Sequence, residues 1–239
     1  MEGGERGVEI GRVLDWIFPR FCLRCNAEGS SWCNSCAMTF VPRPAEACCA
    51  FCHATGSPTT CEDCRPETFL DGLTSVAPYG NAIVREALTN WKYHADPEMG
   101  KAIDLWIRQS VGARGFPGTL VPSGATITFL PLHASRRRHR GFDQAEEVAR
   151  SLAAALGTTH QPLLQRTTAT ASQAQRSASE RKVGDLDGIF ETAGPVPESV
   201  IVCDDVCTSG ATIDAAAEAL KRAGAKRVWG FVVAQGSRP

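Results

Sequence analysis

Four Cys-x-x-Cys pairs between residues 22 and 64 constrain the fold of this chain more than any other feature. Seven residues separate the first two pairs and eight separate the last two, so the cysteines divide into two tetrads: Cys22, Cys25, Cys33 and Cys36, then Cys49, Cys52, Cys61 and Cys64. A CxxC turn places two thiolates on one side of a tight loop, and two such turns complete the tetrahedral shell that zinc prefers. The spacing therefore predicts two structural zinc sites in a small module that depends on metal to fold.

The same cysteines allow other interpretations from sequence alone. The tetrads could interleave, or only one of them could hold metal. A CxxC pair can also be a redox centre, although such a pair usually stands alone at a strand-to-helix junction. The stretch from Cys49 to His53 matches the CxxCH pattern of haem attachment, but that chemistry requires export and would leave Cys61 and Cys64 unexplained. Because four thiolates close the zinc shell, we expect structural rather than catalytic sites.

The amino-terminal residues argue against export and so for a reduced compartment, and the charge balance fits an ordinary globular protein. Glu2, Glu5 and Glu9 stand where a signal peptide has positive charge, and the apolar stretch 13–18 is interrupted by Asp15. No run reaches the ~18 apolar residues of a membrane helix. The 239 residues carry 25 Lys and Arg against 26 Asp and Glu, which is neither a polycation nor an acidic tail. We expect a cytoplasmic globular protein with no membrane span.

Changes in residue pattern divide the chain into three regions. We expect an N-terminal helix in residues 1–19, the cysteine module in residues 20–70 and an α/β domain in residues 71–239. In the last region, strand-like and helix-like segments alternate, as in a parallel sheet with helices on both faces. The strand-like segments are 72–78, 126–130, 199–203 and 227–234, and the helix-like segments are 81–94, 99–111, 143–156 and 211–223. Residues 165–188 are polar and predict a long loop.

The sequence DDVCTSGAT, residues 204–212, links a buried strand to a helix. Hydroxyl residues and Gly at the start of a helix expose backbone N–H groups, and together with the helix dipole these favour an anion. Two carboxylates at the strand end can accept hydrogen bonds from neighbouring sugar hydroxyls. No GxxxxGK[ST] or GxGxxG motif occurs, which disfavours the ordinary nucleotide-hydrolase and dinucleotide folds. A simple helix cap beside solvated aspartates is the alternative to a ribose 5-phosphate site.

This segment resembles the phosphoribosyl-diphosphate (PRPP) signature of type I phosphoribosyltransferases. Residues 131–144, PLHASRRRHRGFDQ, resemble the PLHxxRxRxRGFNQ segment of the ComF family, competence-associated proteins with a cysteine ribbon before a phosphoribosyltransferase-like domain. The resemblance covers about residues 20–235. It implies a type I phosphoribosyltransferase-like parallel sheet preceded by a small four-cysteine zinc-ribbon module. It also implies an enzyme that uses PRPP and Mg²⁺ and transfers phosphoribosyl to an acceptor that the sequence does not identify.

The resemblance carries roles over to individual residues. It implies that Asp204 and Asp205 act at the ribose, and that the 5-phosphate is held by Thr208, Ser209, Gly210, Ala211 and Thr212. Diphosphate binding is implied for Lys92, Leu132, His133, Arg136, Arg138 and Arg140, and a flexible loop for the segment with Gln173 and Arg181. The chain departs from the family at Asp143, where Asn is usual, and in 182–187, which lacks the Asn that usually follows the loop arginine. Both departures bear on the second-substrate pocket.

The basic residues leave a second function open. The arginines of residues 135–140 suit a diphosphate, and they equally suit nucleic-acid phosphates. The family's name implies an alternative function, the handling of single-stranded DNA during uptake. Residues 131–182 carry nine basic and four acidic residues, a net charge of +5, whereas residues 1–70 carry six and nine, a net charge of −3. Two zinc tetrathiolates would make the latter more negative still, so DNA is expected at 131–182. The cysteine module is expected to stabilise the domain or to bind a protein partner through exposed Trp32 and Phe40.

Overall fold

A four-stranded parallel sheet forms the centre of the computed structural model, which describes residues 19–114, 124–132, 141–167 and 189–236. The strand order is β1-β6-β5-β2, with β1 at Gly72–Pro78, β2 at Thr126–Phe129, β5 at Ser199–Cys207 and β6 at Arg227–Gln235. All three strand pairs are parallel. The central strands β5 and β6 are largely buried, as strands covered on both faces must be. The α/β sheet predicted from sequence is confirmed.

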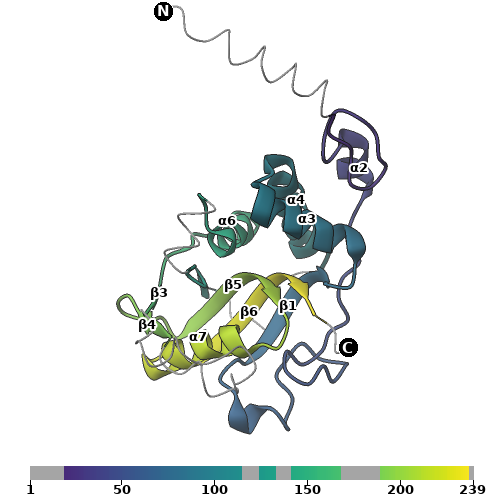
Figure 1. Cartoon of the computed structure of the whole chain (residues 1–239). Helices are drawn as coiled ribbons and strands as arrows, with labels where there is room; N and C mark the ends of the chain where they lie inside the picture. Colours follow the sequence, from purple (N-terminus) through teal and green to yellow (C-terminus); the bar gives the residue numbers. More distant parts are fainter. Residues whose placement is uncertain (1–18, 115–123, 133–140, 168–188, 237–239) are drawn as a thin grey trace, which may run out of the picture.

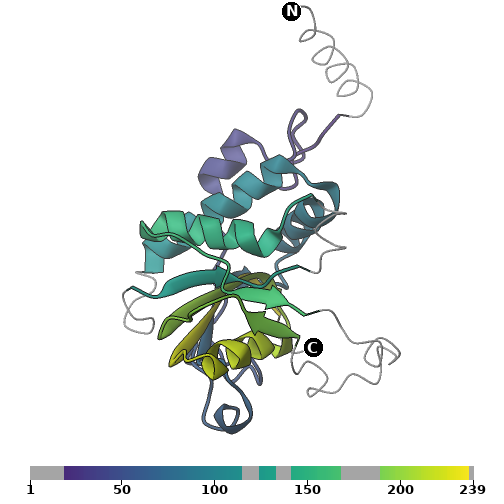
Figure 2. The same ribbon diagram turned by 90° about the vertical axis from the view of Figure 1, so that its left-hand side faces the viewer.

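Helices cover both faces of this sheet (Figures 1 and 2). On one face lie α3 (Ala82–His94), α4 (Pro97–Arg114) and α6 (Gln144–Leu156), and on the other lies α7 (Ala211–Arg222). The apolar face of α6 packs on β5 and β2, and that of α7 packs on β5 and β6. Gly157 ends α6 in a left-handed conformation, as its sequence predicts. The β5–α7–β6 unit brings the start of α7 to the carboxyl edge of the sheet, where α/β proteins place ligands.

Smaller elements complete the described structure. Helix α2 (Asn34–Thr39) and a 3₁₀ turn, η1 (Arg65–Glu67), belong to the cysteine-rich region. Strands β3 (Leu164–Arg166) and β4 (Phe190–Thr192) form a separate antiparallel pair. The predicted loop over 165–188 therefore begins inside a short strand, and its remaining part, 168–188, lies outside the described residues, as does the predicted N-terminal helix. Within the described residues, no helix combines the length and the apolar character that a bilayer crossing requires.

Candidate functional site

Asp204 and Asp205 lie inside β5 rather than after it. The strand keeps its pairing with β6 as far as Cys207 opposite Gln235, four residues beyond the end predicted from sequence, because β6 offers backbone partners up to that point. Successive side chains in a strand point to opposite faces of the sheet. The two carboxylates are therefore carried by a rigid strand and directed to opposite sides of its carboxyl edge.

Lys92 is the cation that faces Asp205 from α3. Its ammonium Nζ lies 2.8 Å from Asp205 Oδ2, and the two side chains are only 19% and 13% exposed. The fold thus joins two residues that sequence reasoning singled out separately, one for the diphosphate and one for the ribose. A partly buried pair of this kind is screened less by salt than a surface pair.

Asp204 is the carboxylate whose protonation the fold alters most. Burial raises its pKa to about 8, and the negative charges of Asp205 and Asp143 act in the same direction. The backbone N–H of Asp205, which donates to Asp204 Oδ1 at 2.8 Å, and the charge of Lys92 oppose this rise. Perturbed carboxyl groups at the ligand edge of a sheet are typical of functional sites.

The segment from Thr208 to Thr212 forms a small pocket at the start of α7. The pocket measures about 50 Å³ and is also lined by Asp204 and Val206 from β5. Thr208, Ser209 and Thr212 are exposed there. The first backbone N–H groups of any α-helix have no intrahelical acceptor. Those at the start of α7 can therefore donate hydrogen bonds to an anion. The pocket thus brings Asp204 together with the predicted 5-phosphate residues, whereas Asp205 faces Lys92.

The diphosphate residues are described only in part. The backbone N–H of Leu132, just beyond β2, donates to Asp143 Oδ2 at 3.1 Å. Leu130 N donates to the carbonyl of Cys203, which keeps this segment beside the end of β5. His133, Arg136, Arg138 and Arg140 lie outside the described residues, and so do Gln173 and Arg181. Of the predicted diphosphate group, Lys92 and Leu132 are therefore the members that the structure places.

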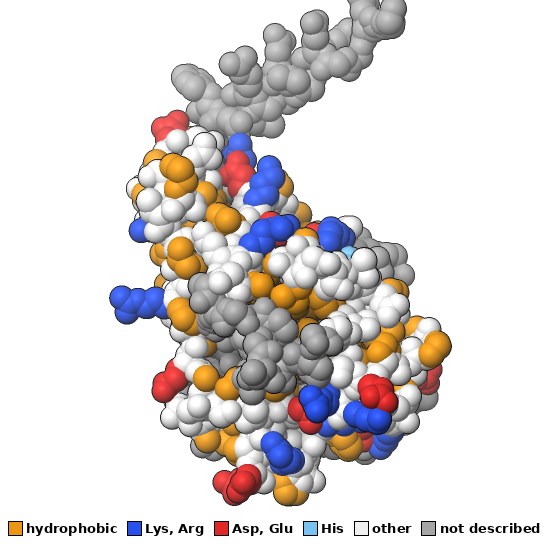
Figure 3. All heavy atoms as spheres, turned by 180° about the vertical axis from the view of Figure 1, so that it is seen from behind, with side chains coloured by type: hydrophobic (Ala, Val, Ile, Leu, Met, Phe, Trp, Pro, Cys, Tyr) orange, Lys and Arg blue, Asp and Glu red, His pale blue; other side chains and the backbone are white. Residues whose placement is uncertain are grey.

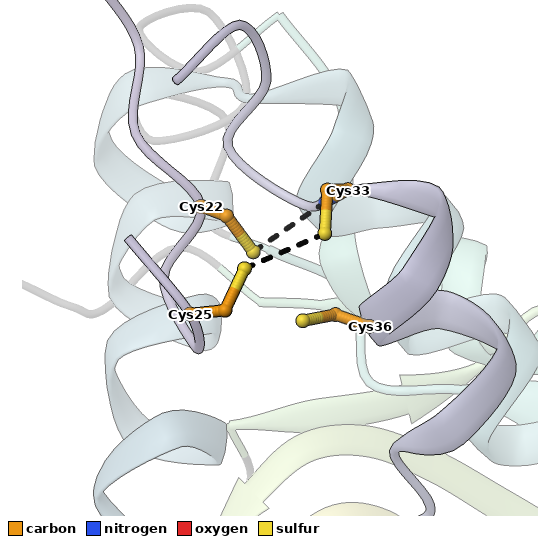
Figure 4. Close-up of side chains that lie close together, drawn as sticks. All are labelled: Cys22, Cys25, Cys33 and Cys36. Atoms are coloured by element: carbon orange, nitrogen blue, oxygen red, sulfur yellow. Dashed lines mark hydrogen bonds between the residues drawn. The ribbon is translucent and has the colours of Figure 1, made fainter. Parts of the chain in front are cut away.

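The eight cysteines of the CxxC pairs gather into two clusters, each from neighbouring pairs. Cys22, Cys25, Cys33 and Cys36 form one cluster (Figure 4) and Cys49, Cys52, Cys61 and Cys64 the other, with all sulfurs of a cluster within 4.8 Å of one another. Cys25 Sγ and Cys33 Sγ are 3.6 Å apart, and Cys52 Sγ and Cys61 Sγ are 3.5 Å apart. Four sulfurs at ~2.3 Å from a tetrahedral zinc lie about 3.8 Å from each other. The clusters are not interleaved, and both fit zinc.

Backbone hydrogen bonds favour a thiolate in each cluster. Burial alone would raise the pKa of Cys22, but N–H groups of Cys33, Cys25 and Arg24 lower it to about 6. In the second cluster, burial is likewise outweighed by N–H groups of Cys52, Cys61 and Phe51, which lower the pKa of Cys49 to about 6. All 11 cysteines are free of disulfides. Two closed sets of four sulfurs account for every CxxC pair, which neither haem attachment nor a single redox pair does.

The first cluster is fixed to α4 by an aromatic contact. The Trp32 ring lies edge-on to Trp106 at 5.3 Å and to Phe40 at 5.4 Å, and Trp32 is only 7% exposed. Glu98 of α4 adds hydrogen bonds from Ser31 N and Ser31 Oγ at 2.6 and 2.8 Å. The prediction that Trp32 is exposed was wrong, because α4 offers it an apolar partner; Phe40 is half-buried by the same contact.

Other apolar side chains are exposed on this part of the molecule. Met38 and Val41 are 78% and 56% exposed, and hydrophobic side chains are visible on the surface there (Figure 3, upper left). A protein partner at the cysteine module stays a prediction. Buried Trp32 does not offer a contact for such a partner, whereas Met38 and Val41 do.

The second cluster packs directly behind the predicted phosphate loop. Gly210 has a left-handed φ of +79°, and a Cβ added there would lie 2.9 Å from Phe51 Cε1 and 3.4 Å from the carbonyl oxygen of Ala50. Residues 50 and 51 are the two residues inside the Cys49/Cys52 turn. Further on, Asp214 Oδ1 in the first turn of α7 accepts the backbone N–H groups of Phe69 and Leu70, both at 2.8 Å. Sequence reasoning missed this contact, since nothing in a CxxC pair indicates what it will pack against.

A larger cavity, of about 530 Å³, lies between α4 and α6. Trp91 and Phe142 line it, with ring centroids 5.6 Å apart. These two residues immediately precede Lys92 and Asp143 in the sequence. The polar lining combines Lys101, Arg108 and Arg150 with Asp96, Asp104 and Glu147.

Comparisons with known proteins support the predicted phosphoribosyl transferase domain and the competence-associated relatives. The model of the phosphoribosyl transferase domain matches residues 139–238. Competence protein ComFC of Streptococcus pneumoniae is 26% identical over 207 residues, covering 85% of this chain and 87% of that protein. Competence protein ComFC of Bacillus subtilis is 27% identical over 236 residues, covering 87% and 91%. DNA utilization protein YhgH of Salmonella typhimurium is 33% identical over 126 residues, covering 52% of this chain and 54% of that protein.

The matches to the two ComFC proteins extend over most of the chain, well beyond the transferase domain alone. The parallel sheet and the two cysteine clusters are the architecture expected for that relationship. The chain therefore has ComFC proteins as relatives over most of its length, and in it a phosphoribosyl transferase domain follows two four-cysteine clusters consistent with a double zinc ribbon.

Proposed function

We propose that this protein binds PRPP at the carboxyl edge of its sheet and transfers the phosphoribosyl group to an acceptor. The observation that carries the proposal is the meeting of three features at that edge: the carboxylates of β5, the start of α7 and the Lys92 ammonium. The first suits ribose hydroxyls, the second a 5-phosphate and the third a diphosphate. The match to the phosphoribosyl transferase domain supports the same assignment.

In this proposal the protein positions the reacting atoms and stabilises charge. Ribose hydroxyls donate to Asp204 and Asp205, and the loop 208–212 holds the 5-phosphate through backbone N–H groups. The bond between ribose C1 and the diphosphate oxygen breaks, the diphosphate leaves with the electron pair, and the acceptor forms the new bond to C1 as it loses its proton. When bound together with PRPP, Mg²⁺ would neutralise part of the negative charge on the diphosphate. The roles of His133, Arg136, Arg138 and Arg140 at the diphosphate stay predictions.

Lys92 has a specific task in this scheme. In the absence of ligand its charge is taken up by Asp205 at 2.8 Å. A diphosphate brings more negative charge than one carboxylate, so Lys92 can turn to it and leave Asp205 to the ribose hydroxyls. Positive side chains that meet charge on a leaving group act mainly on the transition state.

We propose that both cysteine clusters hold structural zinc and that the protein works in the cytoplasm. Sulfur separations of 3.5–3.6 Å within the clusters support zinc. The free state of all 11 cysteines is consistent with a reducing compartment. Because each shell is closed by four thiolates, zinc contributes folding energy here and no catalytic step.

Calorimetric titration of the zinc-replete protein with Mg²⁺-PRPP tests the proposal. The wild-type protein is expected to bind one PRPP per chain, and the double variant Asp204→Asn/Asp205→Asn is expected to lose that binding. Glu191→Gln is the matched control, since it neutralises an exposed carboxylate in β4 away from the site. Retained PRPP binding by the double variant would contradict the assignment of the two carboxylates.

A second candidate function is the handling of single-stranded DNA. The names of the relatives, "competence protein" and "DNA utilization protein", favour a link to DNA, as does the net charge of +5 over residues 131–182. On the face drawn in Figure 3, however, the described basic and acidic side chains are interspersed rather than gathered into a basic stripe. Any DNA contact is therefore proposed for residues 131–182 and not for the cysteine module.

Two measurements on one zinc-replete preparation separate these functions. The first is diphosphate release from PRPP with a panel of acceptors, and the second is binding of a fluorescent oligothymidylate at increasing salt. Diphosphate release without DNA binding favours the transferase. DNA binding that weakens steeply with salt, without diphosphate release, favours the DNA-handling function.

A further inference from the structure

Asp143 lies at the junction of three parts of the carboxylate site. It is 4% exposed and stands at the N-cap of α6 in an extended conformation. Its neighbour Phe142 packs on Trp91, and Trp91 precedes Lys92, the cation that pairs with Asp205. A buried carboxylate is costly unless hydrogen bonds or opposite charges compensate for its lost hydration. The groups that bond to the Asp143 carboxylate therefore indicate its role.

The two carboxylate oxygens of Asp143 hold different elements. Oδ1 accepts the backbone N–H groups of Ala145 and Glu146, at 3.1 and 3.4 Å, which caps α6. Oδ2 accepts the N–H of Leu132, at 3.1 Å, from the segment that follows β2. The side chain thus joins the first turn of α6 to the start of the predicted diphosphate segment.

Capping alone does not require a carboxylate at this position. At α3, the amide oxygen of Asn81 caps the helix by accepting from Ile83 N and Val84 N at 3.1 and 3.2 Å. An Asn at position 143 could cap α6 in the same way, but its NH₂ group would then face the Leu132 N–H, and two donors cannot bond each other. The oxygen that contacts Leu132 is what distinguishes Asp143 from an ordinary cap.

The negative charge of Asp143 also acts on the pKa of Asp204. Among the described residues, the charged groups that act on Asp204 are Asp205 on its own strand, Lys92 on α3 and Asp143 at the start of α6. Burial is the main reason that the pKa of Asp204 is raised, and Asp143 adds to the rise. Neutralising Asp143 therefore lowers the pKa of Asp204.

We propose that Asp143 is a positioning residue of the PRPP site, whose second carboxylate oxygen fixes the start of the diphosphate-binding segment at Leu132 against α6. This inference rests on the proposed function, because it takes that segment as the diphosphate site. The residue acts through the Leu132 backbone and through Asp204. It is a position at which this chain differs from the Asn of the resembled motif, and the difference gives the site an oxygen acceptor where an amide would present a donor.

The first test needs no PRPP. Hydrogen exchange of the Leu132 amide is compared in the wild-type protein, in Asp143→Asn and in Asp96→Asn. Asp96 is the matched control, since its Oδ1 caps α4 by accepting from Glu98 N and Met99 N at 2.8 and 3.4 Å. Leu132 is expected to exchange about tenfold faster in Asp143→Asn, the order expected for one lost hydrogen bond, and at the wild-type rate in Asp96→Asn. Unchanged Leu132 exchange in a folded Asp143→Asn protein would overturn the inference.

The second test uses Mg²⁺-PRPP as the probe. At a pH above both binding midpoints, Asp143→Asn is expected to weaken PRPP binding by about tenfold, while Asp96→Asn leaves it unchanged. Because Asp204 accepts from the ribose as a carboxylate, the pH midpoint of binding is expected to move to lower pH in Asp143→Asn, a change that a merely structural defect would not produce. Wild-type affinity and an unmoved midpoint in Asp143→Asn would contradict the inference. Absence of PRPP binding by the wild-type protein would instead contradict the proposed function, and Leu132 exchange would still report on the hydrogen bond.

Discussion

The substitution Gly210→Ala tests whether the second cysteine cluster supports the phosphate loop. Gly210 has a φ of +79°, and a side chain in that region costs roughly 1–2 kcal/mol. The new Cβ would also lie 2.9 Å from Phe51 Cε1, a separation that real Cβ atoms essentially never show, and 3.0 Å from Phe51 Cδ1. Overpacking of this kind typically costs about 1–3 kcal/mol. We therefore expect Gly210→Ala to lower the free energy of unfolding by about 2–5 kcal/mol.

Gly157→Ala is the matched control for the backbone contribution. Gly157 has a φ of +65°, and a Cβ added there would meet nothing within 4 Å. Gly157→Ala should cost only the conformational part, about 1–2 kcal/mol. The difference between the two variants then measures the steric contribution at Phe51.

The assay is urea unfolding of the zinc-replete protein, arranged as a double-mutant cycle between Gly210→Ala and Phe51→Ala. Removing the Phe51 ring frees the space that the new Cβ needs, so the two substitutions should be less than additive by about 1–3 kcal/mol. PRPP binding should fall in Gly210→Ala and be unaffected in Gly157→Ala. Equal losses of stability in both glycine variants, or strict additivity with Phe51→Ala, would refute the contact between cluster and loop.

Three further predictions follow from the described contacts. Native mass spectrometry should find two zinc ions per chain and one in Cys25→Ser; two zinc ions in that variant would contradict the first cluster as a zinc site. Trp32→Ala should cost about 3–5 kcal/mol of stability, whereas exposed Met38→Ala should change it by less than about 0.5 kcal/mol, and similar costs would contradict the docking of the first cluster on α4. The raised pKa of Asp204, about 8 in the folded protein, means that the native state retains a proton that the unfolded state releases, so stability should fall as pH rises from about 4 to 8. The slope from this group is at most about 1.4 kcal/mol per pH unit, and Asp204→Asn should remove it; an identical pH profile in the variant would show that Asp204 titrates normally.

Local patterns in the sequence predicted most of the fold. The cysteine spacing predicted two tetrads because a CxxC turn is set by adjacent residues, and both clusters form as predicted. The apolar strands and amphipathic helices predicted the parallel sheet covered on both faces. The end of β5 was predicted four residues too early, since polar Asp204 and Asp205 interrupt the apolar run while β6 continues to supply hydrogen bonds.

The long-range contacts could not be predicted from such patterns. Trp32 was expected to be exposed, and its contacts with Trp106 of α4 and with Phe40 explain its burial. The contact of Phe51 with Gly210 joins residues far apart in the sequence, and neither shows a local signal for it. Asp143 was recognisable as a departure from a motif, but its link to Leu132 depends on how β2 and α6 meet. Lys92 and Asp205 were each predicted for PRPP, and their pairing with each other joins residues more than 100 positions apart, so no local pattern indicates it.

The measurement that tests the proposed PRPP site most directly is ³¹P NMR of PRPP titrated with the zinc-replete protein, because it observes the 5-phosphate and the diphosphate separately. The signals of both groups, one from the 5-phosphate and two from the diphosphate, are expected to shift and to saturate at one PRPP per chain. In Gly210→Ala the change at the 5-phosphate should be lost first, since that residue forms the loop at the start of α7. Signals that stay unchanged at millimolar protein, or a response of the diphosphate alone, would contradict a ribose 5-phosphate site at this edge of the sheet.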